Sequence, residues 1–90
     1  MLDVTYSSKF KKDFKTCIKR HCKMDLLQQA IDTLRVPEKL PEKNKDHMLS
    51  GNFSSYRECH IEPDWLLIYQ QTNTELFLYR TGTHSDLFSN

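Results

Sequence analysis

The chain has 90 residues, 38% hydrophobic and 28% charged, with a formal net charge of +1, which excludes two separate cores and a disordered chain. No apolar run approaches the roughly 20 residues of a membrane helix and the start lacks a secretory-signal pattern, so we expect one soluble cytoplasmic domain over residues 1–90 with no membrane partner. The three cysteines are an odd number without CxxC spacing, which indicates reduced thiols rather than a disulfide framework or a cysteine-type zinc site.

The first two elements expected along the chain are a strand and a helix. Residues 2–6 alternate apolar and polar side chains, as a short strand does. Ser7 or Ser8 could cap a helix that follows, because apolar residues then recur at i, i+4, i+7 and i+8. This predicted apolar stripe consists of Phe10, Phe14, Cys17 and Ile18. We expect the lysines of the segment to lie on the other side of the helix.

The charge is distributed unevenly along the chain. Between Lys9 and Lys23 there are seven basic residues and one acid, Asp13, which is a local charge of +6. From Phe53 onward two basic residues and five acids give a local charge of −3. The basic segment could face phosphates or an acidic protein partner. A solvated helix surface is an equally good interpretation of the charge alone.

A second helix is expected to begin near Asp25, which could cap it with Gln28 three residues on, and to end before Pro37. Its predicted buried residues are Leu26, Leu27, Ala30, Ile31 and Leu34. Residues 37–52 contain two prolines, a glycine and six charges, which favours a loop. Three strands and a short C-terminal helix are then expected, over residues 53–61, 64–70, 75–82 and 84–88.

These elements predict a small α+β domain. Consecutive antiparallel strands form a meander, and the two N-terminal helices must cover one of its faces. The opposite face then lacks a helical cover, and we expect it to be a shallow concave surface where side chains of different strands meet.

The polar residues that are unusual for such a meander are candidates for a site on this surface. They are His47, His60, Asp64, Arg80 and His84, with Trp65 and Phe88 beside them. Strand alternation places Tyr56, Glu58 and His60 on one face. In the last strand Arg80 shares its parity with Leu76 and Leu78, so alternation alone leaves open whether His60 and Arg80 converge.

If these residues converge, they supply what metal-independent RNA cleavage needs. Imidazoles have an ordinary pKa of about 6.5, so they can accept and donate protons near neutral pH. A base takes the proton of a 2′-hydroxyl, an acid protonates the 5′-oxygen that leaves, and a cation stabilises the charge on the phosphorus. An aromatic face can stack on an unpaired base.

Each candidate also has a structural interpretation. Trp65 precedes three aliphatic residues and could belong to the core, Arg80 could only pair with an acid, and Asp64 follows Pro63 as a turn former does. Three histidines and an aspartate could alternatively bind zinc. The histidines are far apart in the sequence and form no HxxxH or HExxH pair, so no metal site and no cofactor are expected.

Three segments carry a resemblance to a known family. DHMLSG (46–51), YRECHIEPDWLLIY (56–69) and RTGTHSDLF (80–88) resemble, in order and spacing, the YafQ branch of the RelE/ParE toxin superfamily. The resemblance implies a RelE-like fold and a toxin of a bacterial type II toxin–antitoxin system. It further implies a ribosome-dependent endoribonuclease that cuts messenger RNA in the ribosomal aminoacyl site without a metal or cofactor and so inhibits translation.

The resemblance also implies roles for residues and partners. It places catalysis on His47, His60, Asp64, Arg80 and His84. Our hypothesis for their roles makes His84 the general acid, His47 or His60 the base with Asp64 tuning the nearby imidazole, and Arg80 the residue that binds the phosphate. The expected RNA-binding residues are Trp65, Phe88, Lys45, Lys9, Lys11 and Lys12. The implied partners are the ribosome with its 16S ribosomal RNA, the messenger RNA, and a cognate antitoxin in a heterotetrameric complex that binds operator DNA.

Two other functions share this fold. A ParE-like toxin binds DNA gyrase without a ribonuclease site, and a toxin relic would only bind an antitoxin. The joint presence of His47, His60 and His84 favours the nuclease, since a binder has no need of them.

Overall fold

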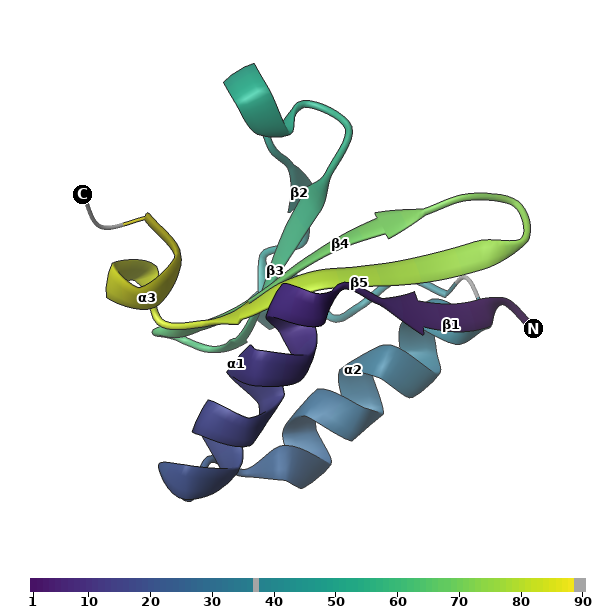
Figure 1. Cartoon of the computed structure of the whole chain (residues 1–90). Helices are drawn as coiled ribbons and strands as arrows, with labels where there is room; N and C mark the ends of the chain where they lie inside the picture. The colour runs from purple at the N-terminus through teal and green to yellow at the C-terminus, as the bar shows by residue number, and fades with distance from the viewer. Residues whose placement is uncertain (37, 89–90) are drawn as a thin grey trace.

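The computed structural model of the chain describes residues 1–36 and 38–88, and it is an α+β domain with two helices on one face of a five-stranded sheet (Figure 1). The elements are β1 (Asp3–Tyr6), α1 (Ser8–Lys19), α2 (Met24–Arg35), β2 (His47–Met48), β3 (Arg57–Glu62), β4 (Trp65–Gln71), β5 (Glu75–Gly82) and α3 (His84–Phe88). Two short 3-10 turns, Glu42–Asn44 and Gly51–Phe53, flank β2. Within the described ranges, no helix has the length and apolarity that crossing a membrane requires.

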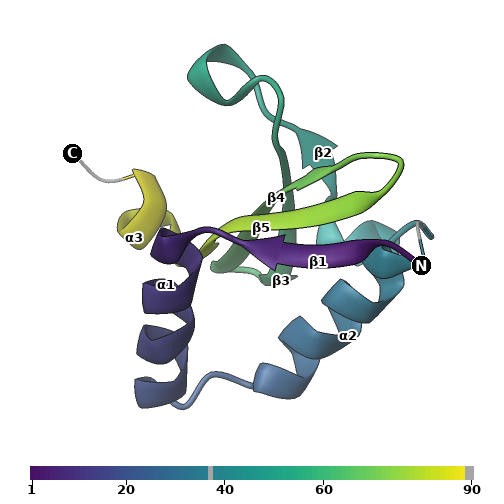
Figure 2. The ribbon, with the colours of Figure 1, turned by 45° about the vertical axis from the view of Figure 1, so that its right-hand side comes forward.

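The strand order in the sheet is β1-β5-β4-β3-β2. The antiparallel meander expected from the sequence is confirmed for β3, β4 and β5, and β2 extends it. β1 is parallel to β5 and forms the outer edge beside it, with Asp3 opposite Glu75 and Tyr6 opposite Leu78. Both ribbon views show this first strand beside the last one (Figures 1 and 2).

Helix α1 begins as predicted, but only half of its predicted stripe is buried. Ser7 is the N-cap, and its Oγ accepts a hydrogen bond from the backbone N–H of Phe10 at 2.9 Å. Phe10 and Cys17 are buried, whereas Phe14 and Ile18 are 38% and 52% exposed. The reason is that α1 packs mainly on β5 and diverges from α2 (Figure 2), so its side facing away from the sheet has no cover.

Helix α2 begins one residue earlier than expected, at Met24. Lys23 occupies the N-cap without a side-chain hydrogen bond, so the prediction of Asp25 as the cap is wrong. Asp25 lies instead in the first turn, where its negative charge favours the positive end of the helix dipole. The buried positions agree with the prediction, fully for Leu27, Ala30 and Leu34 and partly for Leu26 and Ile31. The predicted stop at Pro37 falls on a residue outside the described ranges.

The segment expected as a loop contains structure, and the first predicted strand begins at Arg57 rather than at residue 53. Asp46 fixes this segment to the sheet, because its Oδ1 accepts hydrogen bonds from the Tyr69 hydroxyl at 2.7 Å and from Arg57 Nε at 3.3 Å. Burial raises the pKa of Tyr69, which keeps its hydroxyl a donor. Residue 47 follows directly, so these bonds place His47.

The core lies between the sheet and the two N-terminal helices, and it includes Phe10, Leu27, Trp65 and Leu67. The opposite face of the sheet is not bare. Leu66 and Ile68 alternate with the core residues of β4 and are also buried. Helix α3 lies against β5 near the C-terminal end of that strand (Figure 1). It covers part of the face that the sequence predicted to be without a helix.

Candidate active site

Three histidines from separate elements lie close together. His47 belongs to β2, His60 to β3, and His84 is the first residue of α3. The ring centroids of His60 and His84 are 5.7 Å apart. His47 Nε2 and His60 Nε2 lie 3.6 and 3.5 Å from the same oxygen, Oε1 of Glu58. The three imidazoles that the sequence singled out therefore lie together, with His60 between the other two.

Glu58 is a site residue that the sequence reasoning did not single out. Its side chain is only 8% exposed, although carboxylates are usually solvated, and it faces two imidazoles. A buried carboxylate is stabilised by a hydrogen-bond donor or a positive charge beside it. One signal was available: strand alternation puts Glu58 on the same face as His60. The missing information was β2, which is too short for a periodic pattern and which brings His47 opposite Glu58.

Asp64 orients the third imidazole. Its Oδ1 lies 2.6 Å from His84 Nδ1 and accepts a hydrogen bond from the backbone N–H of His84 at 3.0 Å. The backbone hydrogen bond, and then the side-chain hydrogen bond, hold the pKa of Asp64 below its ordinary value. With Nδ1 directed at Asp64, Nε2 is left for a substrate. The carboxylate partner of His47 and His60 is Glu58, so Asp64 serves only His84.

The start of α3 is fixed by a network of hydrogen bonds. Thr83 Oγ1 accepts from the Asp86 N–H at 3.1 Å, and Asp86 Oδ2 accepts from the Thr83 N–H at 3.0 Å. Arg20, at the end of α1, donates to both carboxylate oxygens of Asp86. Gly82 has a φ of +157°, and a Cβ there would lie 2.9 Å from Asp86 Oδ2. This glycine and this network set the direction in which α3 leaves β5 and so the position of His84.

Arg80 reaches the site face because of a β-bulge. The register of β4 and β5 shifts between Ile68 and Tyr69, so that Ile68 pairs with Arg80 and Tyr69 with Leu78. The unpaired residue, Tyr79, reverses the alternation of side chains along β5. Arg80 therefore lies on the same sheet face as its cross-strand neighbours Ile68 and Glu58, and not on the face of Leu78. This bulge is the feature that parity counting in the sequence missed.

Arg80 is also paired with an acid. Its Nε and Nη2 donate to the two carboxylate oxygens of Asp13 at 2.7 and 3.0 Å, and this hydrogen bonding raises the pKa of the guanidinium. Asp13 Oδ2 accepts the Thr81 N–H as well. The guanidinium is therefore held in place from α1 while its side chain stays 25% exposed, and Nη1 takes no part in the pair.

Trp65 is buried, which corrects its expected role as a stacking surface. Only 5% of the residue is exposed, and the indole lies in the core beside residues such as Leu67. Its Nε1 donates to Thr81 Oγ1 at 2.9 Å, and Thr81 Oγ1 donates to the Leu66 carbonyl at 2.7 Å. Trp65 thus ties β4 to β5 next to Arg80 and offers no free face to a base.

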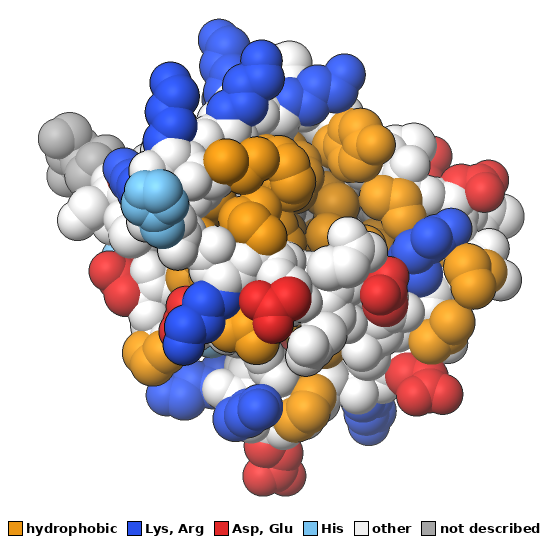
Figure 3. Space-filling view, turned by 90° about the horizontal axis from the view of Figure 1, so that it is seen from below, with side chains coloured by type: hydrophobic (Ala, Val, Ile, Leu, Met, Phe, Trp, Pro, Cys, Tyr) orange, Lys and Arg blue, Asp and Glu red, His pale blue; other side chains and the backbone are white. Residues whose placement is uncertain are grey.

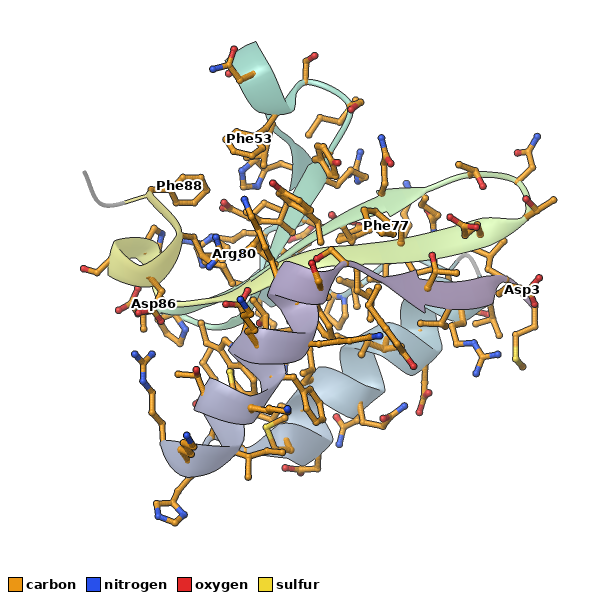
Figure 4. All side chains as sticks on the ribbon, viewed as in Figure 1. Asp3, Phe53, Phe77, Arg80, Asp86 and Phe88 are labelled. Carbon is orange, nitrogen blue, oxygen red and sulfur yellow. The ribbon has the colours of Figure 1, made fainter. Side chains whose placement is uncertain are left out.

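The remaining predicted RNA-binding residues are exposed. Phe88 is 42% exposed, and Figure 4 shows it pointing toward Phe53, with ring centroids 6.2 Å apart. The Lys45 carbonyl lies 2.6 Å from His47 Nδ1, which orients that ring. The first helix divides its lysines: Lys9 Nζ lies 5.9 Å from the ring centroid of Tyr79, near the site, whereas Lys11 lies over Tyr6. Lys12 is exposed.

The face formed by the two helices differs from the site. In Figure 3 its centre shows hydrophobic side chains with basic side chains along one border. A groove of about 360 Å³ on α1 is lined by Tyr6, Phe10, Lys11, Phe14 and Lys15. In the part of the chain that the structure describes, no group of three or more His, Cys, Asp or Glu side chains is arranged to hold a metal ion.

The chain is similar to proteins of known family. A family profile described as "Bacterial toxin of type II toxin-antitoxin system, YafQ" matches residues 2–89. The mRNA interferase toxin YafQ of Escherichia coli strain K12 is 44% identical over 89 residues, which is 96% of this chain and 95% of that protein.

Solved structures agree with this match. The crystal structure of YafQ from E. coli strain BL21(DE3) superposes with a TM-score of 0.92 at 42% identity and covers 98% of this chain and 99% of that one. YafQ in the E. coli DinJ–YafQ complex superposes with a TM-score of 0.90 at 43% identity, with the same coverage.

Proposed function

This chain belongs to the YafQ family of toxins of bacterial type II toxin–antitoxin systems, and on that basis we propose that it is a ribosome-dependent endoribonuclease. It cuts messenger RNA in the ribosomal aminoacyl site and so inhibits translation in the bacterial cytoplasm. The reaction is an attack of the 2′-hydroxyl on the adjacent phosphorus, and it uses acid–base groups of the protein without a metal ion.

The observation that carries this proposal is the convergence of three imidazoles with two separate carboxylates. Glu58 faces His47 and His60, and Asp64 faces His84. Proton uptake and proton donation can therefore use different imidazoles, one beside Glu58 and the other beside Asp64. Positioned acid–base groups of this kind accelerate reactions by roughly 10²–10⁴-fold.

The proposed steps assign each proton and bond. His60 or His47 accepts the proton of the 2′-hydroxyl, and Glu58 stabilises the imidazolium that forms. The 2′-oxygen bonds to phosphorus, the bond between phosphorus and the 5′-oxygen breaks, and His84 protonates that oxygen from Nε2. Arg80, held by Asp13, stabilises the negative charge on the phosphorane. The products are a 2′,3′-cyclic phosphate and a 5′-hydroxyl end.

The proposal includes partners. E. coli YafQ has been crystallised in complex with DinJ, and we propose that a cognate antitoxin inhibits this chain in a heterotetrameric complex that binds operator DNA. The ribosome, with its 16S ribosomal RNA, supplies binding surface that 90 residues cannot. The lysines in the first turns of α1 contact the RNA of the ribosome with its bound messenger, and such contact depends on salt more than on sequence.

The test is cleavage of messenger RNA by the purified protein with added ribosomes, mapped by primer extension in the presence of EDTA. We expect cuts within codons that require ribosomes and persist in EDTA. His84→Asn should lower the cleavage rate by at least about 10²-fold, because it removes the proton donor.

The matched control is His21→Asn. His21 lies in the turn after α1 with a φ of 60°, a conformation that asparagine tolerates. The His21→Asn protein should therefore cleave at the wild-type rate. Full cleavage by His84→Asn would overturn the assignment of the acid. No cleavage by folded wild-type protein free of antitoxin would favour a binding toxin, with gyrase as the next target.

A further inference from the structure

A cluster of aromatic side chains lies beside the candidate active site and has no part in the chemistry above. The rings of Tyr56 and Tyr79 have centroids 4.8 Å apart, and Phe53 lies 6.3 Å from each of them. Phe53 in turn lies 6.2 Å from Phe88 on α3. We call Tyr56 and Tyr79 the tyrosine pair. All four residues keep part of their surface exposed, unlike the buried aromatic residues of the core.

The tyrosine pair is next to the groups that handle the phosphate. Tyr56 directly precedes β3 and lies two residues before Glu58, a separation of at most about 6.6–6.8 Å in extended chain. Tyr79 directly precedes Arg80 at the β-bulge. A nucleotide whose phosphate is at Arg80 and His84 would therefore place a neighbouring base over the tyrosine pair.

The surroundings of the tyrosine pair fit a nucleotide rather than a purely apolar partner. Lys9 Nζ lies over the Tyr79 ring, 5.9 Å from its centroid, and adds a positive charge beside the pair. Arg80 is already paired with Asp13, so Lys9 is the free cation that lies against these rings among the described residues. The Ser7 hydroxyl donates to the Tyr79 carbonyl, which joins Tyr79 to the start of the helix that carries Lys9.

We propose that Tyr56 and Tyr79 form a stacking site for one unpaired base of the RNA, next to the phosphate that is cleaved, and that Lys9 contacts the following phosphate. This inference rests on the proposed ribonuclease function and assigns a substrate-positioning surface to it. Stacking on an aromatic face tolerates any base, so the site orients the strand, and preference among bases follows stacking strength.

The first test compares Tyr79→Leu with Tyr79→Phe in ribosome-dependent cleavage. Loss of the ring should lower kcat/KM by about fivefold or more, within the range that one stacked base contributes, while phenylalanine should retain the wild-type value. Tyr6→Leu is the control, because Tyr6 is an exposed tyrosine stacked on Phe10 in the α1 groove, and it should cleave like wild type. Wild-type kcat/KM in a folded Tyr79→Leu protein would overturn the inference while leaving the nuclease assignment intact.

The second test needs neither the ribosome nor cleavage. An uncleavable trinucleotide with 2′-O-methyl sugars is added to the His84→Asn protein, and aromatic ¹H–¹³C NMR signals are followed. We expect upfield shifts of the Tyr56 and Tyr79 signals and none for Tyr6. If the tyrosine signals do not move at saturating trinucleotide, the stacking site is wrong, even if the wild-type protein proves to be a nuclease. If they move but the wild-type protein never cleaves messenger RNA on ribosomes, the stacking site stands and the proposed function fails.

Discussion

Each of the three imidazoles lies beside one of two carboxylates, and the two carboxylates differ in burial. Glu58 is buried and faces His47 and His60, whereas Asp64 and His84 are both more than half exposed. A buried carboxylate interacts more strongly with a neighbouring imidazolium than an exposed one, since water screens less. In the proposed reaction the base is one of the two imidazoles at Glu58, and the acid is the exposed His84.

The buried position of Trp65 leads to a prediction that separates structure from RNA contact. Trp65→Phe removes the indole N–H that bonds to Thr81 and leaves a small void in the core. We expect the free energy of unfolding to fall by about 1–3 kcal/mol, with KM for programmed ribosomes unchanged. Chemical denaturation and cleavage kinetics measure the two quantities.

The comparison variant is Phe88→Leu, whose side chain is exposed on α3. It should keep the wild-type stability and raise KM. The interpretation of Trp65 as a core residue would be abandoned if Trp65→Phe raised KM several-fold without loss of stability.

At the scale of elements, the position of α3 depends on α1. Arg20 bonds to Asp86, and this hydrogen bond is the largest cause that lowers the pKa of Asp86 to about 2 from its ordinary 3.8. A carboxyl whose pKa is lowered in the folded state contributes stability above its unfolded pKa, and this contribution is lost as the pH falls toward 2. The docking of α3, and with it His84, should therefore weaken in acid.

Arg20→Gln tests this coupling. Because Arg20 is half exposed, solvent screening limits its contribution, and we expect only a small loss of stability at pH 7. The difference from wild type should shrink as the pH falls from 4 toward 2, where Asp86 becomes protonated in both proteins. Denaturation at several pH values measures it. Cleavage at pH 7 should also slow several-fold, since His84 loses its fixed position; a pH-independent difference in stability would speak against the Asp86 partner.

At the scale of the whole molecule, the small net charge hides exposed basic residues on α1 and just before β2. Lys9 and Lys12 lie in the first turns of α1, and Lys45 precedes β2. The formal net charge of +1 would not by itself predict binding to RNA. The position of the basic residues in the fold, rather than their number, should decide the binding.

Replacing Lys9, Lys12 and Lys45 by glutamine should weaken the cleavage of programmed ribosomes. If all three contact phosphates, the slope of log(kcat/KM) against log[salt] should become shallower by about 2. The control set is Lys19, Lys23 and Lys39; either set lowers the formal net charge from +1 to −2. Equal slopes for the two sets would show that net charge alone matters.

The sequence determined the fold class, most of the elements and the identity of the family. Strand and helix periods reflect local burial, and burial repeats every two or 3.6 residues whatever the rest of the chain does. The segments DHMLSG, YRECHIEPDWLLIY and RTGTHSDLF carried the family resemblance, and the match over residues 2–89 confirmed it. The roles of His47, His60 and His84 in cleavage stay predictions.

Only the tertiary structure decided how the site is assembled. A bulge at Tyr79 reversed the parity of β5 and turned Arg80 to the site face, and a two-residue strand placed His47 opposite Glu58. Trp65 entered the core instead of the surface. Each of these outcomes depends on pairing between residues distant in the sequence, and a register shift of one residue changes the face of every side chain that follows. Local periodicity does not depend on such pairing. The sequence therefore predicted which residues belong to the site but not which residues they contact.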